Sequence, residues 1–344
     1  MTNKFIIQRG RQKSVKEIFG ALDIPDYYFD FRELTIFKKF SPFALFIKAF
    51  MTSFEFPKDI DFLLCEGALC TLVGIFYKIR NPKTFLAAYI IDPAFWVKNK
   101  NSFKLLIRSK LHRKFVDHSI CITKMVQDDA LNNKFVSSIK KTSIISLPST
   151  IRTIKTINSY SNRSFALTGC ISIIYIIDRP EDTQYTKGLD IVLEICKKLY
   201  YLNKNFKLNI YGKGTENLNI EAPWLIKHGY SENLLKEYEY ADFFILPSRY
   251  DASSIALIES ISYGLIPIVS EKVGSNEFLK TNIDNINFII DIKEINLWAQ
   301  QILFFNSLSN KLKDNIVKEL RENIKDNTYE TTLEKFKELL TRFD

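Results

Sequence analysis

The sequence predicts an α/β protein built from two doubly wound parallel-sheet domains. The chain has 344 residues, 46% of them hydrophobic, which is enough to fill two cores of ordinary size. Apolar runs of strand length alternate with helical stretches, as parallel sheets require. A stretch rich in Ser, Thr and Asn, residues 150–162, is expected to link the halves. We therefore expect an N-terminal domain over residues 1–160 and a C-terminal domain over residues 161–327.

Six short apolar segments are the expected strands of the N-terminal half, with helical stretches between them as in a Rossmann-like domain. They are residues 5–8, 28–31, 62–65, 84–91, 119–123 and 143–147. The last segment of the chain, residues 328–344, predicts an amphipathic helix with Leu333, Phe336 and Leu340 on one side.

Two carboxylates eight positions apart, Asp251 and Glu259, are the strongest functional signal in the sequence. The apolar run Phe243–Leu246 predicts a buried strand, and Ser253 and Ser254 are good caps for a helix that runs through Glu259. The unbonded N–H groups at such a helix start favour an anion. Asp251 can then hydrogen-bond sugar hydroxyls and Glu259 a ribose diol. The alternative is a capping acid and a solvated helix acid.

Six motifs follow one another in order between about residues 173 and 290. They are Ile176-Ile-Asp-Arg179 with Lys187-Gly-Leu-Asp190, Ile210-Tyr-Gly-Lys-Gly214, Ile226-Lys-His-Gly-Tyr230, Ala241-Asp-Phe-Phe-Ile-Leu-Pro-Ser248, Val273-Gly-Ser-Asn-Glu277, and the carboxylate pair itself. Together they resemble the nucleotide-binding domain of the retaining glycosyl transferases group 1 family, which has the GT-B fold. Asp251 replaces the family's first glutamate, and Asp178 stands where the family usually has glycine.

The resemblance implies a GT-B fold, in which two Rossmann-like domains face a central cleft and the last helix packs back on the first domain. It also implies a donor site for a nucleotide diphosphate sugar. Arg179 and Lys187 would stabilise the charge that develops on the leaving diphosphate, and Lys187 would begin a helix. The loop with Ile226, His228 and Gly229 would contact the base.

The N-terminal half resembles the acceptor-side domain of the same family faintly. Its first strand is followed by a basic loop with a single glycine, Gly10, which can still hold a phosphate. Asp92 follows the fourth expected strand, where relatives often have a histidine, and Glu66 follows the third. Asp92 and Glu66 are candidates for contact with donor or acceptor, although Asp92-Pro93 is also an ordinary turn.

Charge is unevenly distributed along the chain. Residues 1–165 carry 27 Lys and Arg and 13 Asp and Glu, a net charge of +14, whereas the remainder carries 21 and 26, a net charge of −5. No nucleic-acid-binding motif accompanies the basic half, so we expect an anionic membrane surface or a lipid-linked acceptor and no nucleic acid. The basic and aromatic residues 32–56 fit a bilayer interface, or alternatively a helix packed within the first domain.

The sequence predicts a cytoplasmic protein, peripheral on the inner face of the membrane. We expect no signal peptide, because the first apolar run is only three residues long, and no membrane span, because the longest apolar stretch is too short to cross a bilayer. Five cysteines in apolar or helical settings are expected to be reduced thiols. Neither they nor the three histidines have metal-ligand spacing, and Asp59-Ile-Asp61 is expected to be a turn. We therefore expect no cofactor or metal besides the donor substrate.

These observations lead to one main hypothesis and two alternatives. The main hypothesis is a retaining hexosyltransferase that uses a nucleotide diphosphate sugar and a glycan or lipid-linked acceptor in surface polysaccharide or glycoconjugate synthesis. The departures at Asp251 and Asp92 also fit a sugar-nucleotide-binding partner subunit with weakened chemistry. A nucleotide-sugar epimerase on the same fold is the third possibility.

Overall fold

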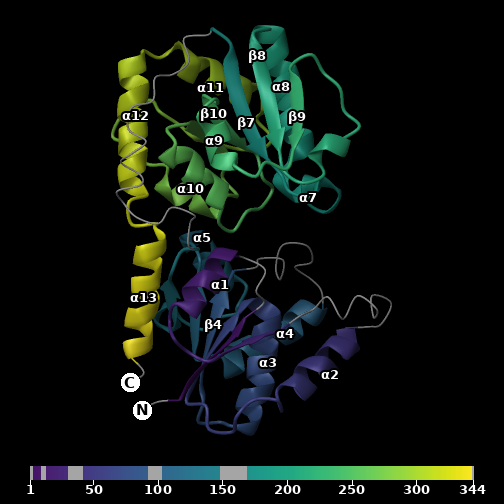
Figure 1. Cartoon of the computed structure of the whole chain (residues 1–344), viewed down its shortest axis with the longest axis vertical. Coiled ribbons are helices and arrows are strands. Elements are labelled where there is room, and N and C mark those ends of the chain that lie inside the picture. The colour runs from purple at the N-terminus through teal and green to yellow at the C-terminus, as the bar shows by residue number, and fades with distance from the viewer. Residues whose placement is uncertain (1–2, 9–12, 30–41, 92–102, 148–168, 343–344) are drawn as a thin grey trace. The chain divides into compact units, whose positions relative to one another are not determined.

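The computed structural model divides into two compact units, each with a parallel sheet between helices (Figure 1). Unit 1 comprises residues 1–148 and 329–344, and unit 2 comprises residues 149–328. The expected α/β fold class is therefore confirmed. The structure describes residues 3–8, 13–29, 42–91, 103–147 and 169–342.

Unit 1 contains a six-stranded parallel sheet in the order β2-β1-β3-β4-β5-β6. Its strands are β1 (Lys4–Gln8), β2 (Asp26–Tyr28), β3 (Phe62–Glu66), β4 (Phe85–Ile90), β5 (His118–Cys121) and β6 (Thr142–Ile144). Its helices are α1 (Lys13–Gly20), α2 (Pro42–Thr52), α3 (Gly67–Arg80), α4 (Phe103–Phe115), α5 (Lys124–Asn132), the short η3 (Ile139–Lys141) and α13 (Tyr329–Thr341). Each of the six expected strands overlaps an observed one; the second shares only Tyr28 with β2, and residues 30–31 of that prediction lie outside the described residues.

The two faces of the first sheet are covered by different helices. Ala49 of α2 and Tyr77 of α3 share a buried core with Ala88 of β4, so α2 and α3 cover one face. Side chains alternate along a strand, so the next residue, Tyr89, points to the other face. There its ring packs against Phe336 of α13, with 5.2 Å between ring centroids.

The last helix of the chain, α13, is part of unit 1. Phe336 also packs edge-on against Phe19 of α1, with 5.5 Å between ring centroids. Lys4 Nζ donates to the carbonyl of Leu340 over 2.9 Å, and the Tyr329 hydroxyl donates to the carbonyl of Glu17 over 3.2 Å. The apolar side of this helix thus completes the core around α1.

Unit 2 contains a second six-stranded parallel sheet, in the order β12-β11-β10-β7-β8-β9. Its strands are β7 (Ile171–Ile176), β8 (Phe206–Tyr211), β9 (Leu225–Gly229), β10 (Phe243–Leu246), β11 (Ile266–Ser270) and β12 (Ile289–Ile290). Its helices are α7 (Pro180–Lys187), α8 (Leu189–Leu202), α9 (Leu234–Tyr238), α10 (Ile255–Ser262), α11 (Ile295–Ser307) and α12 (Asn310–Asn323), with short turns η4 (Thr215–Asn217) and η5 (Gly274–Phe278).

The central strands of the second sheet are buried on both faces, as their near-continuous apolar sequences predict. Every residue of β10 and of β11 is buried. In a parallel sheet the carboxyl ends of the strands meet at one edge, and ligands of doubly wound folds bind beside that edge. The loops that follow β7, β8, β9 and β10 therefore determine what this unit can bind.

Candidate functional site

An ion pair links two of those loops at the carboxyl edge of the second sheet. Lys187 Nζ lies 2.6 Å from Asp251 Oδ2. The Lys187 side chain is 32% exposed and that of Asp251 9%, so a ligand can reach the cation while the carboxylate stays largely shielded. The structure thus brings together two of the residues that the sequence identified, although 64 positions separate them.

Lys187 ends one helix and immediately precedes another. It is the last residue of α7, and Gly188 is both the C-cap of α7 and the N-cap of α8. The expectation that Lys187 lies in the first turn of a helix is therefore wrong. The eight residues after Arg179, Pro180 to Lys187, form the additional helix α7, at whose C-terminus a cation is favoured.

The glycine after Lys187 allows the chain to approach the end of β10 closely. Gly188 has φ of +75°, and a Cβ atom there would lie 2.1 Å from the carbonyl oxygen of Pro247. No other residue type fits this contact without displacing the backbone. On the other side, the Tyr175 hydroxyl of β7 donates to the Lys187 carbonyl over 3.0 Å. These two contacts fix the backbone from which the Lys187 side chain extends.

Arg249 is a site residue that the sequence reasoning missed. Its guanidinium donates to both carboxylate oxygens of Asp190, over 2.7 and 2.6 Å, and also to the Tyr185 carbonyl. Its backbone N–H donates to the Thr186 carbonyl over 2.8 Å. These bonds raise the pKa of Arg249 and lower the pKa of Asp190. Arg249 therefore fastens the loop after β10 to both helices that flank Lys187.

The backbone of Asp251 is held by the loop after β11. Its N–H donates to the Lys272 carbonyl over 2.9 Å, and its carbonyl accepts from the Gly274 N–H over 2.7 Å. These contacts leave the carboxylate as the free end of the residue, directed at Lys187. Backbone hydrogen bonds, rather than the ion pair, thus hold the main chain of Asp251 in one conformation.

The helix start after Asp251 forms as the sequence predicts. Ser254 is the N-cap of α10, and its hydroxyl accepts from the Leu257 N–H over 3.2 Å. The Ser254 N–H itself donates to the Ser275 hydroxyl over 2.8 Å, so it is not available to an anion. Ser253 is partly exposed. The N–H groups offered to a ligand are those of the first helical turn, which begins at Ile255.

Glu259, the second acid of the pair, is buried inside unit 2. It is 6% exposed, and the Tyr238 hydroxyl donates to its Oε2 over 3.3 Å. Burial, together with the charge of Glu259 and this hydrogen bond, raises the pKa of Tyr238. The alternative interpretation of Glu259 as a solvated helix acid is therefore wrong. A buried carboxylate is retained at a cost in solvation, which favours a functional role.

Arg179 lies apart from the Lys187–Asp251 pair. It precedes α7 with φ of +50°, a conformation that is uncommon for residues other than glycine, and its N–H donates to the Lys213 carbonyl over 2.9 Å. Its Nε lies 3.4 Å from Asp178 Oδ2, and both side chains are more than half exposed. Lys187 lies eight positions after Arg179, at the far end of α7, so about 12 Å of helix separates their backbones.

The segment expected to be a base-contacting loop is a strand. Ile226 and His228 lie within β9, and Gly229 ends it with φ of +74°. His228 stacks on Tyr211 with ring centroids 4.2 Å apart, and its Nε2 lies 2.9 Å from Asn209 Oδ1. Both side chains line a groove of about 380 Å³ over β7, β8 and β9. Of the three, Gly229 alone lies at the carboxyl edge.

Comparisons with known proteins bear on the family and the fold. Residues 181–331 match the family described as "Glycosyl transferases group 1". The chain carries a group 1 glycosyltransferase domain. A glycogen synthase from Clostridium botulinum is 30% identical to the chain over 104 residues, which are 27% of this chain and 21% of that protein. The chain thus matches about a fifth of the length of such relatives.

Solved structures extend the likeness to the whole fold. A UDP-forming trehalose-phosphate synthase from Burkholderia xenovorans superposes with a TM-score of 0.72 and 10% identity, covering 98% of both chains. The structure of Anabaena Alr3699/HepE in complex with UDP and glucose superposes with a TM-score of 0.69 and 13% identity. The superposition covers 99% of this chain and 100% of that one. At these identities the likeness shows the fold, and the predicted GT-B fold class is confirmed.

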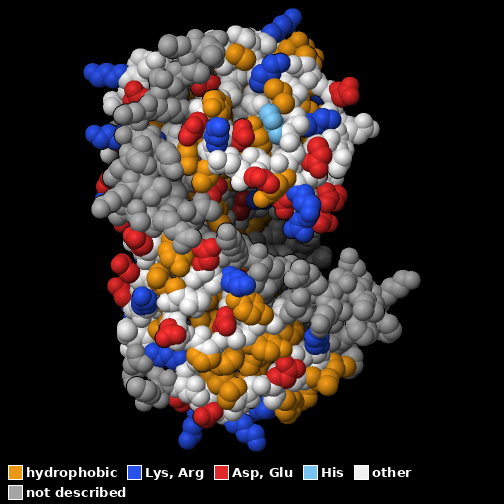
Figure 2. Space-filling view, in the orientation of Figure 1, with side chains coloured by type: hydrophobic (Ala, Val, Ile, Leu, Met, Phe, Trp, Pro, Cys, Tyr) orange, Lys and Arg blue, Asp and Glu red, His pale blue; other side chains and the backbone are white. Residues whose placement is uncertain are grey.

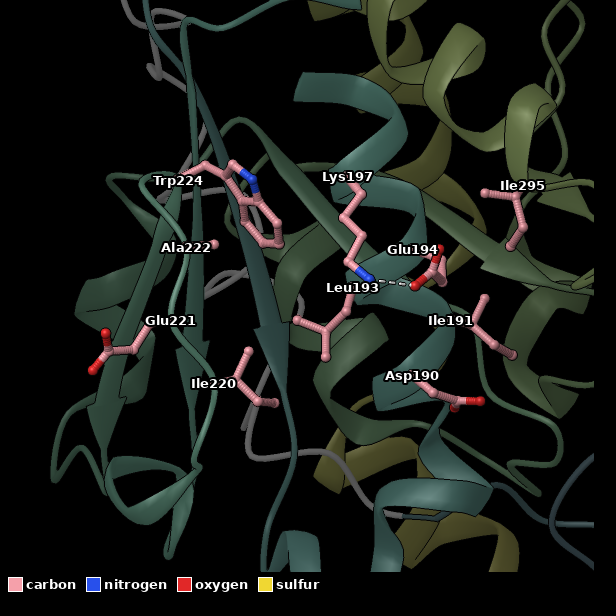
Figure 3. A pocket seen from close by; sticks show the side chains of 10 residues that line it. All are labelled: Asp190, Ile191, Leu193, Glu194, Lys197, Ile220, Glu221, Ala222, Trp224 and Ile295. Atoms are coloured by element: carbon pink, nitrogen blue, oxygen red, sulfur yellow. Dashed lines mark hydrogen bonds and ion pairs between the residues drawn. The ribbon is translucent and has the colours of Figure 1, made fainter. Parts of the chain in front are cut away.

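A second hollow of the group 1 domain lies away from the ion pair (Figure 3). It has a volume of about 350 Å³ and lies between α8 and the segment before β9. Figure 3 shows Leu193 of α8 and Trp224 on opposite sides of it, and Lys197 directed at Glu194, 2.6 Å away. Asp190 borders this hollow but Lys187 and Asp251 do not. Its lining is mainly apolar, which does not fit a diphosphate.

The remaining predicted site residues belong to unit 1. Gly10 and Asp92 lie outside the described residues. Glu66 is the last residue of β3 and is buried, and its charge contributes to the raised pKa of Tyr89, after burial itself. In the part of the chain that the structure describes, His, Cys, Asp and Glu side chains form no group suited to a metal ion. Metal independence stays a prediction.

Proposed function

We propose that this protein is a retaining glycosyltransferase that moves a hexosyl group from a nucleotide diphosphate sugar to a hydroxyl of a glycan or lipid-linked acceptor. The observation that carries the proposal is the Lys187–Asp251 pair at the carboxyl edge of the second sheet, within a group 1 domain. Lys187 is a partly exposed cation beside the shielded carboxylate of Asp251. Such a pair suits a ligand with a diphosphate at one end and hydroxyls at the other.

The proposed reaction breaks the bond between the anomeric carbon and the diphosphate oxygen and forms a bond from the same carbon to the acceptor oxygen. The acceptor proton passes to the departing phosphate on the same face of the sugar, so the configuration is retained. The products are the glycosylated acceptor and the nucleoside diphosphate. Negative charge grows on the leaving phosphate, and that is where the protein must supply positive potential.

Four of the predicted residues, all in unit 2, have a role in the proposed reaction. Lys187 stabilises the leaving diphosphate, with the first turn of α10 contributing its dipole. Arg179, at the other end of α7, reaches the diphosphate from the side of β7. Asp251 accepts hydrogen bonds from the donor sugar, and Glu259 from the ribose. Arg249 is a positioning residue, because it contacts the backbone beside Lys187 and no reacting group.

The names of the similar proteins support a nucleotide-sugar donor. The Burkholderia enzyme is described as UDP-forming, and the Anabaena protein was crystallised with UDP and glucose. Another neighbour is a lipopolysaccharide outer core galactosyltransferase, with a TM-score of 0.71 and 12% identity. We propose by analogy that the chain acts in polysaccharide or glycoconjugate synthesis, on the cytoplasmic side of a membrane and without a metal.

Thermal stabilisation by nucleotides tests the donor site. The melting temperature is measured with UDP, GDP, ADP and their sugars for the wild type, Lys187→Ala and Glu259→Ala. We expect one nucleotide series to raise it, and we expect both variants to lose most of that shift. Lys197→Ala is the control, because Lys197 is an exposed cation in an ion pair on α8. The donor-site proposal fails if a folded wild type responds to no nucleotide.

Product analysis separates the transferase from its alternatives. A transferase releases nucleoside diphosphate in an acceptor-dependent manner, and the anomeric signals of the new linkage match those of the donor sugar. An epimerase would convert the donor without any acceptor. A binding subunit would show the nucleotide-induced shift without turnover.

A further inference from the structure

We propose that one face of unit 1 docks on an anionic lipid bilayer, an interaction that goes beyond the transferase reaction. This surface, the α2–α4 face, consists of α2 with the turn that follows it to Phe54, together with α3 and α4. Figure 2 shows hydrophobic side chains gathered into one area of unit 1. In the described residues, no helix is both long and apolar enough to cross a membrane, so any contact made by this part of the chain is peripheral.

The apolar part of the α2–α4 face is a stripe that points to solvent. Ile47, Phe50, Met51 and Phe54 are 44, 44, 64 and 55% exposed. Their positions follow the i, i+3, i+4, i+7 spacing of one helix side, continued into the turn after α2. Ile79 of α3 adds a further side chain that is 48% exposed. An exposed aliphatic and aromatic stripe of this size is typical of an interaction surface.

Packing within the unit uses only part of the stripe, since Phe50 alone among its residues makes a ring contact with α3, to Phe76 with 5.5 Å between ring centroids. The opposite side of α2 already supplies Ala49 to the core, where it is 1% exposed. Outside the core, the Phe50 ring packs edge-on against Phe54, with 5.0 Å between centroids, and the Arg80 guanidinium lies 3.7 Å from the Phe54 ring centroid. Arg80 also donates to the Ser53 carbonyl over 2.6 Å. The exposed rings are therefore held in place at the surface with a cation beside them.

Charge favours an anionic partner. Helix α2 contains one basic residue, α3 two and α4 five, and none of the three contains an Asp or Glu. By contrast α13, on the other face of the sheet, carries Glu330, Glu334 and Glu338 with two lysines. The helices beside the apolar stripe thus carry basic side chains and no acidic ones of their own, and one of these basic residues, Lys78 of α3, is ion-paired with Asp117. Basic and apolar side chains together bind the interface of anionic membranes.

The same charge argues against a second copy of the chain as the occupant. Two α2–α4 faces brought together would oppose like charges across an apolar contact, which is unfavourable. A bilayer with anionic head groups receives the apolar stripe and neutralises the basic side chains around it. We therefore assign the face to a lipid surface.

Vesicle co-sedimentation of the full chain tests the assignment. The probes are vesicles of phosphatidylcholine alone and vesicles of equal parts phosphatidylcholine and phosphatidylglycerol, without donor or acceptor. We expect binding to the anionic vesicles at least about tenfold stronger than to the neutral ones, and weaker binding as salt rises. Because no substrate is present, the result does not depend on the proposed transferase activity. A wild type that binds neither vesicle overturns the proposal.

Variants locate the binding on the α2–α4 face. Met51→Glu combined with Phe54→Ser should weaken binding to anionic vesicles by at least about tenfold, and Lys110→Glu with Lys114→Glu should also weaken it. Tyr201→Glu is the matched control, because Tyr201 is 84% exposed on α8 of unit 2. Binding by the first variant at the wild-type level overturns the proposal. So does a dimer in sedimentation velocity that Met51→Glu dissociates, because a second copy would then occupy the face.

Discussion

Lys187 Nζ and Asp251 Oδ2 lie 2.6 Å apart, and this contact joins the end of α7 to the loop that follows β10. Around it, Arg249 bonds to the backbone on the α7 side and to Asp190 on the α8 side. The ion pair therefore lies in a frame of main-chain contacts that does not depend on its own charge. A donor that displaces the pair can use both side chains without disturbing the fold around them.

Replacement of Asp251 by asparagine should reduce turnover while the protein stays folded. The amide has the size of the carboxylate but no charge, so it holds Lys187 and the donor hydroxyls less well. We expect kcat/KM to fall by about 10²- to 10³-fold, equivalent to roughly 3–4 kcal/mol of transition-state stabilisation. Steady-state kinetics with circular dichroism checks this. Asp128→Asn, which alters an acid that is 50% exposed on α5 of unit 1, is the control; equal turnover in wild type and Asp251→Asn would remove Asp251 from the site.

Gly188→Ala should destabilise unit 2. The residue has φ of +75°, and the new methyl group would meet the Pro247 carbonyl oxygen at 2.1 Å. We expect the free energy of unfolding to fall by at least about 2 kcal/mol, because both strain and a backbone clash are introduced. Gly20→Ala is the control, since no atom lies within 4 Å of its added Cβ. Its free energy of unfolding should stay within about 1 kcal/mol of the wild type. Denaturant unfolding compares the two variants. A similar loss of unfolding free energy in both would contradict the special requirement for glycine at position 188.

Arg249→Lys should weaken donor binding more than it weakens the fold. Lysine keeps the charge but cannot bond both oxygens of Asp190 and the Tyr185 carbonyl at once. Because Asp190 is 60% exposed, the free energy of unfolding should change by less than about 1 kcal/mol. The nucleotide-induced rise in melting temperature should nevertheless shrink, as Lys187 loses its fixed position. Lys325→Ala, at an exposed ion pair with Glu322, should leave that rise intact. If the nucleotide-induced rise in Arg249→Lys equals that of the wild type, Arg249 does not position Lys187.

Acid should destabilise unit 1 through His112. Burial lowers the pKa of this histidine to about 4, whereas the unfolded chain has an ordinary value near 6.5. Between these values the unfolded state binds more protons, so stability is fully present above pH 6.5 and is lost as pH falls toward 4. At pH 5 the loss is up to about 2 kcal/mol.

Denaturant unfolding at pH 7 and pH 5 measures this loss, and His112→Gln should remove most of the difference. Burial also lowers the pKa of His118, with Arg342 contributing. His118→Gln therefore serves as the comparison that separates the two histidines. A pH dependence that is the same in wild type and His112→Gln would assign the effect elsewhere.

Local patterns predicted most elements of the fold and part of the site. The apolar run Phe243–Leu246 forms β10 and the cap at Ser254 begins α10, because both signals depend on neighbouring residues. Family resemblance selected Lys187 and Asp251, which the structure brings into contact. The family resemblance implied that Ile226 and His228 lie in a base-contacting loop, whereas the structure places them in β9, where polar and apolar residues alternate. That alternation belongs to an edge strand with one open face.

Contacts between distant positions could not be read from the sequence. Arg249 and Asp190 are 59 positions apart, and each alone is an ordinary surface charge. Glu259 looks like a solvated helix acid until Tyr238, 21 positions earlier, is placed beside it. The exposure of the α2 stripe likewise depends on which side of α2 packs against α3.

By itself, therefore, the sequence determined the strands, the helix caps, the uneven charge and the family of the second half, since these follow from local composition and motif order. The tertiary structure alone decided which charges are paired and which apolar side chains remain exposed. The physical reason is that pairing and burial depend on through-space distances of a few ångströms, which residue order along the chain does not determine.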